Sequence, residues 1–109
     1  MKIQPIGDPE APEKGGAHAH YLMTRTVDNL PLATLSFQQG SILEAGENGV
    51  TIEALLEICA HRLQEFQNGK FSCCENEQAL ANIRCALDAL RSRTKRRVDS
   101  GIEGTYAEL

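Results

Sequence analysis

The stretch that most constrains the fold is residues 51–100, which has the pattern of two amphipathic helices joined by a short break. From Ile52 to Phe66, apolar residues recur at the three- and four-residue spacing of a single helical stripe. A second stripe with alternating spacing runs from Leu80 to Leu90, and alanines between its members keep the helix propensity high. We therefore expect a helical hairpin.

Capping residues mark the ends of both helices. Thr51 is a favourable N-cap for the first helix, and Asn68 with the following glycine offers a left-handed end to it. Ser72 and Glu75 have the Ser-x-x-Glu spacing of a capping box, and Gly101 suits the C-terminal end of the second helix. The predicted helices are 51–68 and 73–100.

The second helix is the longer one, at about 28 residues and roughly 40 Å. Its surplus end should protrude and meet another subunit. The chain of 109 residues is long enough for one domain at most, and a chain of this size buries only about two-thirds of its unfolded surface. Both observations favour oligomerisation.

The first half of the chain predicts a small sheet. Strand-forming residues at 18–27 and 32–38 flank a turn, which indicates an antiparallel pair, and residues 41–43 suggest a short third strand. Residues 1–17 are rich in Pro and Gly without periodicity, and we expect a flexible tail there. The predicted class is α+β: a small N-terminal antiparallel sheet within residues 18–45, followed by the hairpin, in one domain (18–109) that forms homo-oligomers.

Charge is unevenly distributed. The net charge is −4, yet residues 84–97 carry six basic side chains and one acidic one. An anionic body argues against duplex DNA as a partner, while a local cationic patch suits a small phosphate-bearing ligand. The alternative is a solvated helix face, since arginine near a helix C-terminus is favoured by the helix dipole.

Cysteine usage and hydropathy indicate a reducing cytosolic setting. The four cysteines include no C-x-x-C pair, the N-terminus lacks the apolar core of a signal peptide, and no apolar run approaches the roughly 18 residues of a membrane span. His18 and His20 could form a metal pair, but no third ligand has suitable spacing, so surface histidines are the preferred interpretation. We expect no metal or cofactor.

The sequence shows no catalytic fingerprint. It has no nucleophile elbow, phosphate-binding loop, dinucleotide-binding glycine motif or metalloprotease motif. We therefore expect a binding protein and not an enzyme.

The helix junction and the basic run are the candidate binding residues. Phe66, Phe71 and Asn76 surround the junction, where a helix N-terminus can bind anions and a ring can stack on a base. Arg93 and, one turn further, Arg97 lie at the other end, roughly 25 Å away along the helix. An antiparallel two-fold dimer would place the junction of one chain beside the basic end of the other. The alternative is that both rings close the end of the hairpin core.

These residues carry a family resemblance over residues 37–106. The motifs, in order, are Phe37-Gln38-Gln39-Gly40, Asn48-Gly49-Val50-Thr51, Phe66-Gln67-Asn68-Gly69-Lys70-Phe71-Ser72-Cys73-Cys74-Glu75-Asn76, Arg93-Thr94 and Gly101-Ile102-Glu103-Gly104-Thr105. Their order and spacing resemble the phage Thoeris anti-defence protein 1 family. The departures from the usual family residues are Lys70 in place of Pro, Cys74 in place of Arg, Tyr106 in place of His, and Ser41-Ile42-Leu43-Glu44 in place of Pro-Ile-Lys-Glu.

The resemblance implies a signal sponge in the cytoplasm of an infected bacterium. Such proteins bind, without cleaving, the cyclic ADP-ribose isomers (glycocyclic ADP-ribose) made by Thoeris TIR enzymes. Members are dimers or hexamers, and hexameric members also hold cyclic trinucleotides of CBASS immunity at separate sites. The hairpin also resembles that of an anti-CBASS sponge. The resemblance assigns Phe66 to adenine stacking, Asn76 to a ligand hydrogen bond and Arg93 to the pyrophosphate from the partner chain.

Two other functions stay open on the residues alone. One is a small regulatory module that uses the basic end of the second helix to bind protein or RNA. The other is a small hydrolase of the nucleotide signal.

Overall fold

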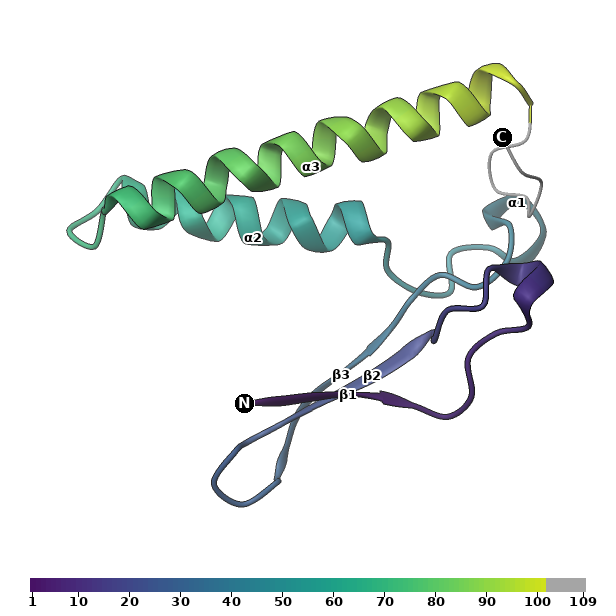
Figure 1. Cartoon of the computed structure of the whole chain (residues 1–109), viewed down its shortest axis with the longest axis horizontal. Helices are drawn as coiled ribbons and strands as arrows, with labels where there is room; N and C mark the ends of the chain where they lie inside the picture. Colours follow the sequence, from purple (N-terminus) through teal and green to yellow (C-terminus); the bar gives the residue numbers. More distant parts are fainter. Residues whose placement is uncertain (102–109) are drawn as a thin grey trace. The chain divides into compact units, whose positions relative to one another are not determined.

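The computed structural model describes residues 1–101, and the chain divides into two compact units, residues 1–50 and the helical hairpin that begins at Thr51. The first unit holds a three-stranded antiparallel sheet and the second holds two long helices, so the class is α+β as predicted. In chain order the elements are β1 (Lys2–Ile6), the short 3-10 helix η1 (Pro12–Lys14), β2 (His20–Thr24), β3 (Pro31–Ser36), α1 (Ile42–Ala45), α2 (Ile52–Gln67) and α3 (Cys74–Asp99) (Figure 1).

The sheet has the order β1-β2-β3, with β2 in the centre. Ile3 pairs with Met23, and Met23 pairs with Ala33. Because residues directly opposite each other in an antiparallel sheet point to the same face, these three side chains form one apolar row. The ring of Tyr21, on the same face two residues earlier, meets the edge of Phe37 with centroids 5.7 Å apart.

Two expectations for the first unit are wrong. Residues 2–6 do not belong to a flexible tail, because Lys2–Ile6 forms the edge strand β1 against β2. Residues 42–45 form the helix α1 and not a strand, because the Ser41 side chain caps them by accepting a hydrogen bond from the Leu43 N–H at 3.1 Å. In each case, pairing or capping overrides a weak local pattern.

A loop closed by two side-chain amides connects β3 to α2. The Gln38 amide donates to the Gly46 carbonyl at 2.8 Å and accepts from the Asn48 N–H at 2.9 Å. Asn48 in turn accepts from the Gln39 N–H and donates to the Gln39 carbonyl, both at 2.8 Å. A β-carbon on Gly49 would lie 2.4 Å from the carbonyl carbon of Phe37, so only glycine fits this closure. The motifs around residues 37–40 and 48–51 are thus one folded loop.

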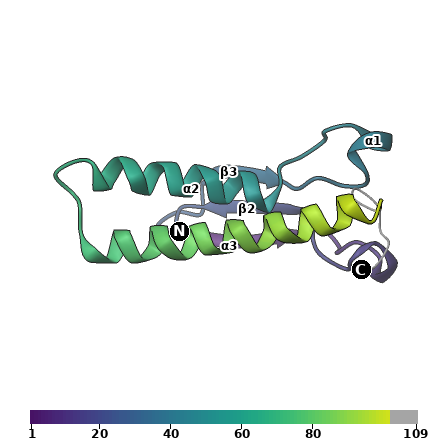
Figure 2. The ribbon, with the colours of Figure 1, turned by 90° about the horizontal axis from the view of Figure 1, so that it is seen from above.

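The second unit is an antiparallel helical hairpin, in which α2 and α3 lie side by side (Figure 2). Thr51 caps α2 by accepting from the Ala54 N–H at 3.1 Å. Leu80 and Leu87 are buried on the inner face of α3, each 4% exposed. Across the hairpin, Arg84 donates to the Gln64 side chain at 2.8 Å, and Arg91 forms an ion pair with Glu57.

The helix α3 extends past the first residue of α2 (Figure 1). The two helices have 26 and 16 residues, and the difference corresponds to about 15 Å at 1.5 Å per residue. We call residues 92–99, which lie beyond the ion pair of Arg91, the overhang. Gly101, with a φ of 74°, follows the last turn and donates its N–H to the Val98 carbonyl at 3.0 Å. Within residues 1–101, no helix combines the length and apolar character needed to cross a membrane.

Candidate functional site

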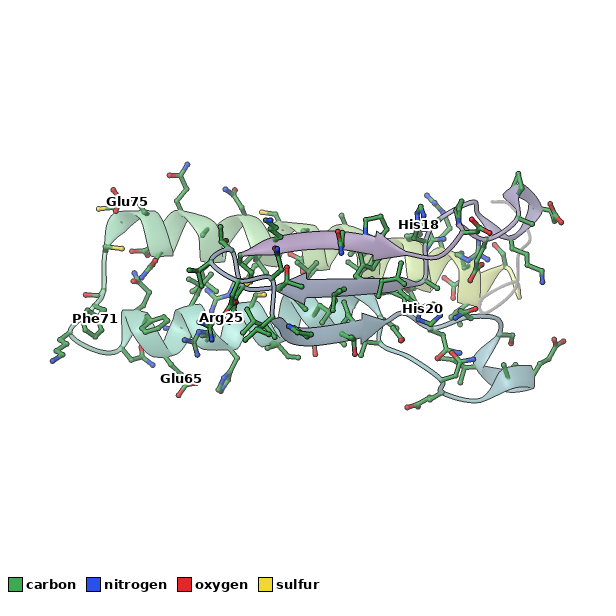
Figure 3. The ribbon with its side chains drawn as sticks, turned by 90° about the horizontal axis from the view of Figure 1, so that it is seen from below. His18, His20, Arg25, Glu65, Phe71 and Glu75 are labelled. Atoms are coloured by element: carbon green, nitrogen blue, oxygen red, sulfur yellow. The ribbon has the colours of Figure 1, made fainter. Side chains whose placement is uncertain are left out.

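Two aromatic rings and two cations gather at the junction between α2 and α3. The rings of Phe66 and Phe71 meet edge to face, with centroids 6.4 Å apart. The Arg62 guanidinium lies 5.1 Å from the centre of the Phe66 ring, and the Lys70 ammonium lies 5.3 Å from that of Phe71. Phe71 is 64% exposed and lies in the turn between the helices, with Glu75 at the start of α3 (Figure 3). The junction therefore presents π-faces and positive charge together.

The backbone of this junction is held by side chains. The Gln67 amide accepts from the Cys73 N–H at 3.0 Å and donates to the Cys73 carbonyl at 3.1 Å. Asn76, which is half-buried, donates to the Phe71 carbonyl at 3.3 Å. These bonds fix the path of the turn and therefore the direction in which Phe71 projects.

The predicted capping box is wrong. The N-cap of α3 is Cys73, with no side-chain cap hydrogen bond, so Ser72 and Glu75 lie one position out of register for reciprocal capping. Gln67, from the preceding helix, satisfies the Cys73 N–H instead. The first turn of α3 carries Glu75 and Glu77, which the helix dipole favours.

The overhang carries the basic side chains of the candidate site. Arg93, Lys95 and Arg96 are exposed, whereas Arg97 is buried, at 7% exposure. The two arginines named from the sequence therefore differ: Arg93 is presented to solvent and Arg97 is not. Because Arg93 lies 17 residues beyond Asn76 in one continuous helix, the two are roughly 25 Å apart. A single chain does not bring the overhang to the junction.

Sequence reasoning missed the cations at the junction itself. It placed the phosphate-binding charge only in the basic run, yet Arg62 stands over Phe66 and Lys70 over Phe71. The sequence does contain a signal for the pair of Arg62 and Phe66. Residues four apart share a helix face, and an arginine on that face can stack on the ring. The hydrogen bonds between Gln67 and Cys73 could not be predicted from helical spacing, because they connect residues on opposite sides of the turn.

Of the two histidines, His20 begins β2 and has ordinary partners, whereas His18 precedes the strand. His20 Nδ1 lies 2.8 Å from the Ser36 hydroxyl, and its Nε2 lies 3.2 Å from the Gln39 side-chain nitrogen. His18 is half-buried (Figure 3). Among residues 1–101, no three His, Cys, Asp or Glu side chains are grouped to hold a metal ion.

Comparison with known proteins gives two findings. The family model described as the Acb2/Tad1 hairpin domain matches residues 34–95, which include the loop after β3, the junction and Arg93. A protein named Thoeris anti-defense 1, from Bacillus phage SBSphiJ7, is 45% identical over 75 residues. That alignment covers 69% of this chain and 53% of the relative, so the chain spans about half the length of the curated relative it matches.

Proposed function

Because the chain belongs to the Acb2/Tad1 hairpin family, we propose that it is a phage anti-defence protein that sequesters a small nucleotide signal. The proposed ligands are cyclic ADP-ribose isomers (glycocyclic ADP-ribose) made by Thoeris TIR enzymes. The protein holds them without cleaving them, in the cytoplasm of the infected host, and uses no cofactor. The observation that carries the proposal is the family match across residues 34–95, which includes both halves of the candidate site.

The junction supplies the half of the site that binds the base. Phe66 stacks on adenine, Phe71 borders it, and Asn76 donates to the ligand. The exposed Phe71 ring, the half-buried Phe66 ring and the half-buried Asn76 amide support these roles, since all three lie at the junction and Asn76 is held there by its hydrogen bond to the Phe71 carbonyl. A base–aromatic stack is worth about 1–3 kcal/mol. Arg62, over Phe66, adds positive charge near the phosphates.

The overhang of a second chain supplies the other half. Arg93 of the partner subunit pairs with the pyrophosphate, because charge-assisted bonds from arginine to phosphate are strong and can be bidentate. Because Arg93 is exposed and Arg97 is buried, we assign the phosphate-binding role to Arg93. The distance between junction and overhang in one chain supports a site shared by two.

Packing supports assembly into a homodimer or hexamer. Among the described residues, the buried hydrophobic side chains are only Ala19, Leu80 and Leu87. Large apolar side chains are exposed in both units, including Ile3 at 69% and Ile58 at 63%. A chain with so little core gains stability by covering such surface with another copy. In a hexamer, cyclic trinucleotides of CBASS immunity are a second class of ligand to test.

Titration calorimetry tests the proposed function. The purified protein is titrated with a cyclic ADP-ribose isomer and, as a control, with linear ADP-ribose. We expect binding of the cyclic isomer near 1 nM, which corresponds to about −12 kcal/mol, and much weaker binding of the linear form. Absence of cyclic-isomer binding contradicts the proposal. Salt-sensitive binding of RNA in its place would favour the regulatory module, whose basic overhang would contact phosphates.

A further inference from the structure

The two cations at the junction are attached to different kinds of backbone. Arg62 belongs to α2 and lies one turn before Phe66, so the regular helix limits where its guanidinium can reach. Lys70 lies in the turn between the helices, is exposed, and places its ammonium 5.3 Å from the centre of the Phe71 ring. The charge of Lys70 therefore lies beside a ring that is itself 64% exposed.

No acidic side chain among the described residues neutralises Lys70. Within residues 1–101, its side chain takes part in no ion pair or hydrogen bond, and the Phe71 ring is its one partner. Glu65, in the last turn of α2, lies 3.0 Å from His61 Nδ1 instead. In Figure 3, Glu65 and Glu75 point to opposite outer sides of the hairpin. The ammonium is thus available to an anion from outside the chain.

The turn holds the backbone around Lys70 but leaves its ammonium free to move. Gln67 forms two hydrogen bonds with the Cys73 backbone across the turn, and Asn76 donates to the Phe71 carbonyl. The lysine stem beyond this backbone is flexible and ends in a compact charge with three N–H donors. At an exposed site, a cation is held more weakly by a ring than by a charge-assisted bond to phosphate. A phosphate beside Phe71 would therefore draw the ammonium away from the ring.

We propose that Lys70 is a specificity-determining residue, whose ammonium donates to a phosphate oxygen of a nucleotide that stacks at the junction of the same chain. The inference rests on the proposed function only for the stacked base. A pyrophosphate has two phosphoryl groups, so Lys70 of one chain and Arg93 of the partner subunit can each contact one of them. The junction of one chain then recognises a base and an adjacent phosphate together, and it favours phosphorylated nucleotides over nucleosides.

Titrations of the chain of residues 1–109 with ADP and with adenosine test this role. The two probes share the base and differ in the phosphates, and NMR shifts of ¹⁵N-labelled protein follow their binding. Lys70→Met keeps the length and apolar stem of the side chain but removes the charge. We expect it to weaken ADP binding about five- to ten-fold and to leave adenosine binding within about two-fold of wild type. Lys70→Arg keeps the charge and should bind both probes within about three-fold of wild type.

Lys95→Met is the matched control, because it makes the same change at an exposed position of the overhang and should not alter the preference for ADP. A Lys70 that only orients Phe71 would weaken ADP and adenosine equally in Lys70→Met. That result, an unchanged ADP affinity, or a wild-type chain that binds neither probe would overturn the assignment. An ADP preference that depends on Lys70, with no binding of the cyclic isomer, would count against the proposed function alone.

Discussion

Gln67, the last residue of α2, forms two hydrogen bonds with the backbone of Cys73, the N-cap of α3, at 3.0 Å and 3.1 Å. We predict that Gln67→Ala lowers the free energy of unfolding by about 1–2 kcal/mol, because it leaves the Cys73 groups without these partners. Thermal unfolding should show a decrease of about 5 °C or more. Gln78→Ala, on the exposed surface of α3, should leave the unfolding temperature unchanged. Equal effects of both substitutions would show that the two bonds add no stability.

A substitution at Phe66 can show whether its ring stacks on a base or only packs at the end of the hairpin. Phe66→Leu keeps most of the apolar volume at the end of the hairpin but removes the ring. We expect the unfolding temperature to stay close to that of wild type while ligand affinity falls by about 5- to 150-fold. Calorimetry and thermal unfolding on the same variant separate the two properties. If Phe66→Leu binds ligand normally, the ring closes the hairpin and does not stack on a base.

Arg93 and Phe66 should complement each other between chains. When each variant is measured alone, Arg93→Ala and Phe66→Ala should both abolish high-affinity ligand binding, while the oligomers persist. Mixing the two variants with subunit exchange creates heterodimers that contain one intact site. With random mixing, about a quarter of the wild-type binding capacity should return. No recovery after verified exchange would show that each chain carries its own complete site. Lys95→Ala, also in the overhang, serves as the control that should retain binding.

Substitution of Gly49 tests how tightly the loop between β3 and α2 is closed. A β-carbon there would lie 2.4 Å and 2.5 Å from backbone atoms of Phe37. We predict that Gly49→Ala destabilises the protein by about 2 kcal/mol or more, because backbone has to shift. Gly69→Ala is the matched comparison: its β-carbon would meet nothing nearer than the Glu65 carbonyl oxygen at 3.7 Å, and it should cost less than about 0.5 kcal/mol. Chemical denaturation of both variants provides the measurement.

The hairpin could be predicted well because its signals are local. Apolar spacing and the Thr51 cap predict α2, and the observed helices, Ile52–Gln67 and Cys74–Asp99, lie within one residue of the expected bounds at each end. The number of residues between Asn76 and Arg93 also predicts their separation, because the rise per residue along one continuous helix is constant.

The remaining features depend on partners distant in the sequence. The strand β1 contains Pro5 and has no long apolar run, and its strand character comes from pairing with β2. The start of α3 is set by Gln67 from across the turn, which a capping-box pattern does not include. Arg97 follows the basic pattern of its neighbours, yet it is buried. The last part of the matched motif, residues 102–106, lies outside the described residues.

The most direct test of the account asks whether bound signal survives. The protein is incubated with a cyclic ADP-ribose isomer, separated from free nucleotide by gel filtration, and denatured by heat, and the released nucleotide is identified by mass spectrometry. A sponge should retain the nucleotide through gel filtration and release it intact in stoichiometric amount, able again to activate a Thoeris effector. Release of a cleaved product, or no retained nucleotide, would contradict the account.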